Sequence, residues 1–147
     1  MNPIVATARI LLGLVFLAAG LSGFLLINNP PPAPPGLAGA FQDVFFRSHW
    51  VLLVDGVEFV AGAVPLSNRF VPLALTLLGA VITNILTFHI TMQPAGIIPG
   101  LVVTVLWTVV AFRFRSSLAP LFVARPEQGR PASAIPKLRV VERALAS

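Results

Sequence analysis

Between Phe70 and Phe112 the chain runs for 43 residues without a single Asp, Glu, Lys or Arg. One membrane-spanning helix needs only about 20 apolar residues, so this run is too long for a single span. The turn-forming residues Gln93-Pro94-Ala95-Gly96 divide it. We therefore predict two spans here, over residues 70–91 and 97–113.

An earlier apolar segment, residues 4–27, is interrupted only by Arg9, and its last 18 residues carry no charge. A cleaved signal peptide is the competing interpretation, because it also places an apolar core near the N-terminus. That core is usually about 7 to 15 residues long and follows a positively charged segment. Arg9 is the only basic residue before this longer run, so we predict a retained first span.

A proline-rich connector follows the first span, with five prolines in six residues. Proline fixes φ and lacks a backbone donor, so this segment ends the helix and extends the chain. Residues 37–49 then predict a short interfacial helix, with apolar side chains on one face and an ion pair between Asp43 and Arg47. The predicted outer loop is residues 28–49.

Residues 50–66 predict the second span, which opens at Trp50 in the aromatic belt of the membrane and ends at the turn 67–69. Small residues within the spans allow close approach of helices. We expect this role for Gly13, Gly20, Gly23, Gly56, Gly62, Gly79 and Ala80.

The predicted fold class is all-α: a polytopic membrane protein with a four-transmembrane-helix bundle, a short interfacial helix and a basic C-terminal tail. Composition agrees, because 56% of the residues are hydrophobic and only 10% are charged, against about 25% in soluble domains. The transmembrane domain is predicted over residues 1–115 and the cytoplasmic tail over 116–147. Within the tail, residues 137–146 form either a short basic amphipathic helix or a mobile segment.

Charge placement predicts the orientation. Seven of the ten basic residues lie at or beyond Arg113, and with four spans they share one side with Arg9 and Arg69, which leaves Arg47 on the other. Basic loops stay in the cytoplasm, so we expect both termini there, in a bacterial-type cytoplasmic (inner) membrane. No aromatic stacking platform accompanies the basic residues, and we expect no nucleic-acid partner.

Ionisable residues inside a membrane are costly and mark candidate sites. Glu58 lies near the middle of its span, and Asn84 in the antiparallel third span reaches a similar depth, which predicts a hydrogen-bonded pair. Arg9 either extends outward to the interface or pairs with Glu58, and we favour the pair because buried charges in membranes usually pair.

Asp55 precedes Glu58 by one helical turn. Two carboxyl groups at this spacing either handle protons or leave Asp55 in contact with water at the outer face. His49 and His89 fall near the outer ends of neighbouring spans and are weak candidates for a metal or haem site, which we do not expect. Cysteine is absent, which excludes disulfides and Cys-ligated clusters in this chain.

Three segments carry a family resemblance: Asp55-Gly-Val-Glu58-Phe-Val-Ala-Gly62, Asn68-Arg69-Phe70-Val-Pro72, and Asn84-Ile-Leu-Thr-Phe88-His89. With Arg9-Ile-Leu-Leu-Gly-Leu-Val-Phe16 they resemble the DoxX and DoxX-like family of small membrane proteins, over most of the chain up to Arg115. The resemblance implies a four-helix membrane bundle. It also implies an association with redox systems, because some members of the family join membrane oxidoreductase assemblies.

We therefore favour a non-catalytic or accessory membrane subunit of a quinone-linked redox complex. Two alternatives stay open: a quinone-reactive oxidoreductase that uses Glu58, Asp55 and His89, and a small oligomeric transporter or permeability factor. A quinone is compatible with the candidate residues, whereas haem is disfavoured. The expected partners are the lipid bilayer and either other membrane subunits or further copies of the chain.

Overall fold

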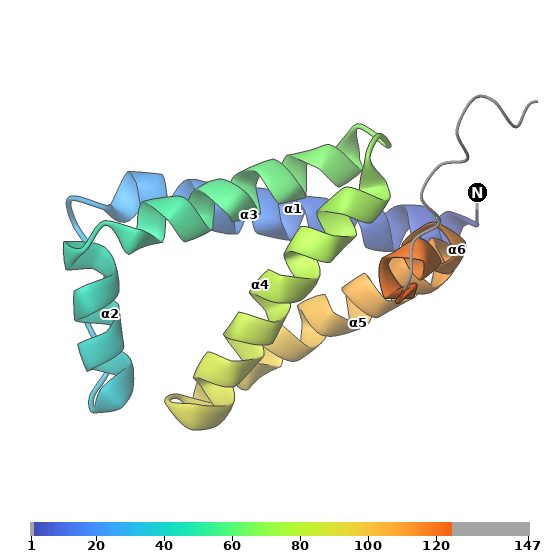
Figure 1. The fold of residues 1–147 in the computed structure, drawn as a ribbon. Helices are drawn as coiled ribbons and strands as arrows, with labels where there is room; N and C mark the ends of the chain where they lie inside the picture. Colours follow the sequence, from blue (N-terminus) through green and yellow to red (C-terminus); the bar gives the residue numbers. More distant parts are fainter. Residues whose placement is uncertain (1, 125–147) are drawn as a thin grey trace, which may run out of the picture.

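A computed structural model of the chain describes residues 2–124, which are folded into helices and turns (Figure 1). The all-α prediction is confirmed for this part, and the helix proposed for residues 137–146 lies outside it. The elements are α1 (Pro3–Leu26), α2 (Leu37–Arg47), α3 (Trp50–Leu66), α4 (Val71–Thr91), η1 (Pro94–Gly96), α5 (Ile97–Arg113), α6 (Arg115–Leu118) and η2 (Ala119–Phe122).

Three helical segments are long and apolar enough to cross a membrane: α1, α4 and the stretch Pro94–Arg113 that joins η1 to α5. The α2 and α3 helices pass the same test only as a pair, and that pair is bent by 86°. At 1.5 Å per residue, α3 alone is about 25 Å long, less than the roughly 30 Å of a bilayer core. Three apolar helices, or four with the bent pair, fit a multi-pass membrane protein.

The bend between α2 and α3 lies at His49, whose φ of 60° is in the left-handed region. The turn is closed by the His49 amide, which donates to the Phe46 carbonyl oxygen at 3.1 Å. Because a left-handed residue cannot continue an α-helix, the chain changes direction here. As a result α2 lies across the ends of α1 and α3 instead of extending α3 (Figure 1).

Glycines bring the antiparallel helices α1 and α3 into direct backbone contact, as predicted from the small residues within these spans. A Cβ atom added to Gly62 would lie 2.5 Å from the Leu17 amide nitrogen, and one added to Gly13 would lie 2.8 Å from the Gly62 carbonyl oxygen. Gly20 faces the backbone of Phe59 in the same way. Gly56 is the exception, since its nearest neighbour would be the Phe24 ring at 3.8 Å.

A tryptophan holds α4 and α5 together. The Trp107 indole packs on Gly79, and its Nε1 donates to the Leu75 carbonyl oxygen at 2.8 Å. Side chains from four helices meet in the common core, including Phe16 of α1, Ala61 of α3, Leu78 of α4 and Val110 of α5. The α1 and α3 pair and the α4 and α5 pair are thus joined on one side by this core.

Candidate functional site

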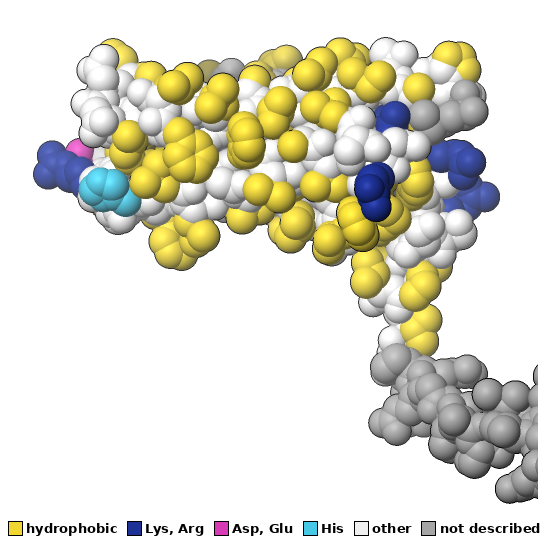
Figure 2. Space-filling view, turned by 90° about the horizontal axis from the view of Figure 1, so that it is seen from above, with side chains coloured by type: hydrophobic (Ala, Val, Ile, Leu, Met, Phe, Trp, Pro, Cys, Tyr) yellow, Lys and Arg dark blue, Asp and Glu magenta, His cyan; other side chains and the backbone are white. Residues whose placement is uncertain are grey.

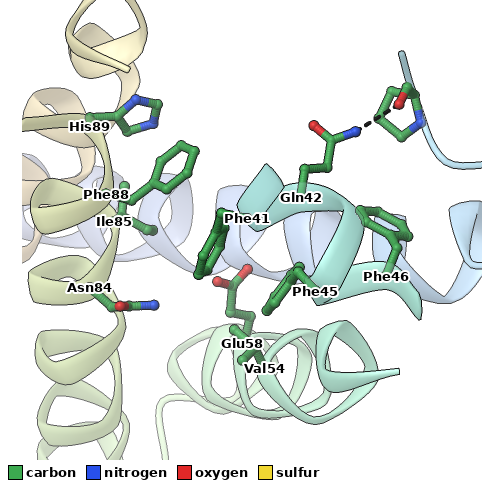
Figure 3. Close-up of a pocket in the computed structure, with 11 residues that line it drawn as sticks. Phe41, Gln42, Phe45, Phe46, Val54, Glu58, Asn84, Ile85, Phe88 and His89 are labelled. Carbon is green, nitrogen blue, oxygen red and sulfur yellow. Dashed lines mark hydrogen bonds between the residues drawn. The ribbon is translucent and has the colours of Figure 1, made fainter. Parts of the chain in front are cut away.

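Between α2, α3 and α4 the structure contains a cavity of about 280 Å³ (Figure 3). Its position follows from the fold, because α2 crosses the end of α3 and faces α4. Apolar residues form most of its walls. The lining residues are Pro31, Phe41, Gln42, Phe45, Phe46, Val54, Glu58, Asn84, Ile85, Phe88 and His89.

Four phenylalanines surround this cavity, three from α2 and one from α4. The rings of Phe41 and Phe45 are stacked with centroids 5.5 Å apart, and Phe41 also meets Phe88 at 5.3 Å. Gln42 ties α2 to the proline-rich connector, because its Nε2 donates to the Pro31 carbonyl oxygen at 2.7 Å. These contacts hold α2 as one wall of the cavity.

Glu58 projects from α3 into the aromatic cavity, with its carboxyl group beside the Phe41 and Phe45 rings (Figure 3). The residue is only 7% exposed. Among residues 2–124 its carboxyl group makes neither an ion pair nor a hydrogen bond. Its oxygens border the cavity and are not fully enclosed by protein, so they can accept hydrogen bonds from a polar ligand or water there.

Asn84 and His89 line the cavity from α4. Asn84 and Glu58 face the same space, as their equal depth indicated, but the described residues contain no hydrogen bond between them. The His89 Nδ1 lies 3.1 Å from the Gln93 carbonyl oxygen. Since a carbonyl oxygen only accepts, Nδ1 carries the proton in this bond, and in the Nδ1–H tautomer Nε2 is an acceptor.

The predicted contact between Arg9 and Glu58 is wrong. The Arg9 guanidinium donates through Nη1 to the Pro65 carbonyl oxygen at 3.0 Å and to the Asn68 side-chain oxygen. Pro65 belongs to the last turn of α3, where carbonyl groups lack helical partners and the helix dipole favours a positive charge. Arg9 is therefore buried at the other end of α3, where it joins α1 to the turn after α3.

Asp55 and His49 also lie outside the cavity. Asp55 is buried against α1, so close to Gly23 that any side chain at position 23 would overlap its carboxylate. His49 is exposed at the bend between α2 and α3. Within residues 2–124, no group of three or more His, Cys, Asp or Glu side chains could hold a metal ion.

Sequence reasoning named only Glu58, Asn84 and His89 among the residues that line the cavity, and it missed the other eight, including all four phenylalanines. It placed α2 at the interface, where aromatic side chains anchor a helix in lipid, and so gave its phenylalanines no role in a site. One signal could have found the cavity. It is the group of phenylalanines Phe41, Phe45 and Phe88, whose rings contact one another beside Glu58 and Asn84.

The arrangement suits a flat, apolar ligand with polar atoms on its edge. Ring systems stack on phenylalanine faces, and a few convergent polar groups fix orientation in such pockets. Glu58 and the His89 Nε2 can accept hydrogen bonds, while the Asn84 amide can also donate one. The volume is large enough for a ring but not for a long lipid tail, which would lie outside the cavity.

No protein-family model, curated protein or solved structure matches this chain.

Proposed function

We propose that this chain is a DoxX-like membrane protein that serves as a non-catalytic or accessory subunit of a quinone-linked redox complex. In this proposal α1, α3, α4 and α5 form a four-span bundle in a bacterial-type inner membrane, with both termini in the cytoplasm. The cavity beside Glu58 holds the ring of a quinone or its reduced quinol. The single observation that supports the ligand class is the buried carboxyl group among phenylalanine rings.

The hydrogen-bonding groups fit both redox forms of such a ligand. A quinol donates through its two hydroxyl groups, and Glu58 and the His89 Nε2 are acceptors. A quinone accepts through its carbonyl oxygens, to which the Asn84 amide can donate. These residues can bind both redox forms, but they are not themselves a redox centre. They therefore suit a subunit that binds a quinone and presents it to a partner. Electrons would then pass through the partner.

Gentle affinity purification of the full chain tests the subunit role. We expect larger oxidoreductase subunits to copurify, identified by mass spectrometry, and quinone to be present in a solvent extract. Purification of the chain with copies of itself alone would refute the accessory role. Quinone-dependent turnover by the purified chain would instead support the quinone-reactive oxidoreductase, in which Glu58 and His89 exchange protons with the ligand.

Quinone binding is tested separately with Glu58→Gln and the control Asp55→Asn. Both residues are buried in α3, but only Glu58 lines the cavity. Glutamine keeps an oxygen that can accept but loses the negative charge, and exchanging a charge-assisted hydrogen bond for a neutral one at a cost of about 1.4 kcal/mol weakens binding about tenfold. We expect that loss for Glu58→Gln in titrations with a short-chain quinol, and little change for Asp55→Asn. Equal affinity in both variants would remove Glu58 from the site.

The unpaired state of Glu58 favours a second candidate, a small oligomeric transporter or permeability factor. A carboxylate surrounded by phenyl rings also suits an organic cation, through charge pairing and cation–π contacts. Phenyltrimethylammonium is a suitable probe, because it has a single ring and carries a fixed charge. Saturable binding and flux that Glu58→Gln abolishes would support this candidate, and flux equal to that of empty vesicles would refute it.

A further inference from the structure

The end of the molecule that contains the N-terminus carries a surface that the cavity does not explain. Here α5 ends, and α6 and η2 continue the chain beside the start of α1 (Figure 1). The segment that leads into the grey residues stands off the side of the bundle, across its long axis (Figure 2). If the long helices cross a membrane, this segment runs along the membrane surface.

Apolar side chains at the end of this segment are unusually open. Leu121 is 62% exposed, Phe122 86% and Val123 55%. These residues lie at the end of the short segment, formed by α6 and η2, that follows the apolar helix α5 and its terminal arginine. Their depth therefore corresponds to the boundary between acyl chains and headgroups, where short apolar segments insert.

Arginines surround the same end. Arg69, Arg113 and Arg115 are all exposed. Figure 2 shows basic side chains gathered here, while the opposite end displays both charges and a histidine. The acidic residues among 2–124 are Asp43 on α2 and two residues buried on α3, and the only ion pair there joins Asp43 to Arg47. No carboxylate of the described chain neutralises the three arginines.

Two of these arginines lie over exposed phenyl rings. The Arg115 guanidinium is 4.7 Å from the centre of the Phe112 ring, and that of Arg69 is 5.9 Å from the Phe70 ring. Both phenylalanines are 68% exposed. When such a ring enters lipid, the guanidinium above it lies at the level of the lipid phosphates. Arginine forms strong, charge-assisted hydrogen bonds with phosphate groups.

We propose that residues 113–123, together with Arg69, form a membrane foot that binds the phosphate groups of anionic phospholipids. Leu121, Phe122 and Val123 insert at the headgroup boundary, and the three arginines bind the phosphates above them. The foot anchors the basic end of the bundle at a fixed depth. This site is separate from the cavity and does not depend on its ligand.

A cysteine-free chain allows a direct test by single-cysteine labelling of the full protein. The variant Phe122→Cys is labelled at its cysteine with an environment-sensitive fluorophore. The labelled protein is then reconstituted into bilayers of phosphatidylcholine, with or without phosphatidylglycerol. The matched control is Val44→Cys, which is 65% exposed on α2 at the opposite end. We expect phosphatidylglycerol to increase quenching of the label at position 122 by lipids with a quencher in the acyl chain, and to leave the label at position 44 unchanged.

The double variant Arg113→Gln, Arg115→Gln then separates charge recognition from simple insertion. Two arginines at an anionic surface account for about a 30-fold preference over zwitterionic lipid, and we expect the double variant to lose it. Native mass spectrometry of retained lipids measures the same ratio independently. Equal quenching in both bilayers, or an unchanged lipid ratio in the double variant, would refute the proposal. Burial of position 122 that depends on protein concentration would also refute it and indicate a contact between copies.

Discussion

The close contact between α1 and α3 gives the sharpest quantitative prediction. Gly62→Ala adds one methyl group where the Leu17 amide nitrogen would be only 2.5 Å away, whereas ordinary contacts of a Cβ atom begin at 3.4 Å. The opposing atoms belong to the backbone of α1, and they cannot move aside as a flexible side chain could. The two helices must therefore separate.

A separation of roughly 1 Å costs a quarter to a half of the dispersion energy of each atom pair at the contact. Overpacking of this kind destabilises a fold by about 1 to 3 kcal/mol. Alanine favours a helix over glycine by up to about 1 kcal/mol, which offsets only part of the loss. We expect Gly62→Ala to lower the free energy of unfolding.

Gly56→Ala is the matched control, because it lies on the same helix and its new methyl group would meet only the Phe24 ring at 3.8 Å. It should be neutral or stabilising, so that the two variants differ by about 2 kcal/mol. Thermal unfolding in mild detergent, followed by circular dichroism at the helix band, measures both Tm values. Equal Tm values for the two variants would show that α1 and α3 are not in backbone contact at position 62.

Two further predictions concern polar side chains. Arg9→Met removes both charge-assisted hydrogen bonds to the turn after α3, and we expect a loss of about 2 kcal/mol in unfolding free energy. In a double-mutant cycle with Glu58→Gln the two effects should add to within about 0.5 kcal/mol, and a coupling above about 1 kcal/mol would mean that the two side chains interact. Trp107→Phe removes the hydrogen bond to Leu75 but keeps an aromatic ring, so it should cost about 1 kcal/mol, and unchanged stability would show that this bond does not hold α4 to α5.

Much of the helical framework could be predicted because it depends on local chemistry. The break at Gln93 and the helix over residues 37–49 follow from turn residues and apolar spacing, and the predicted ion pair of Asp43 and Arg47 forms with atoms 2.7 Å apart. Close packing at Gly62 could be predicted because small residues in apolar helices have few other roles.

The partners of Arg9 could not be predicted from depth along the helices. Depth gives a position along the bundle axis, but it does not give the direction in which a side chain points around its helix. Glu58 points toward α2 and α4, whereas Arg9 meets the last turn of α3. The α2 wall of the cavity was missed for a related reason, because the left-handed turn at His49 redirects α2 across the site.

The hydrogen bond between Arg9 and Asn68 joins residues that are 59 positions apart in the sequence. During synthesis of the chain, Arg9 therefore appears well before its partner. When α1 leaves the ribosome, neither Asn68 nor the end of α3 has been made. Until then the guanidinium stays in contact with water, which a long side chain can reach by extending away from its helix. Only the arrival of the turn after α3 allows Arg9 to be buried. The first helix thus reaches its final position only after α3 and the turn that follows it have formed.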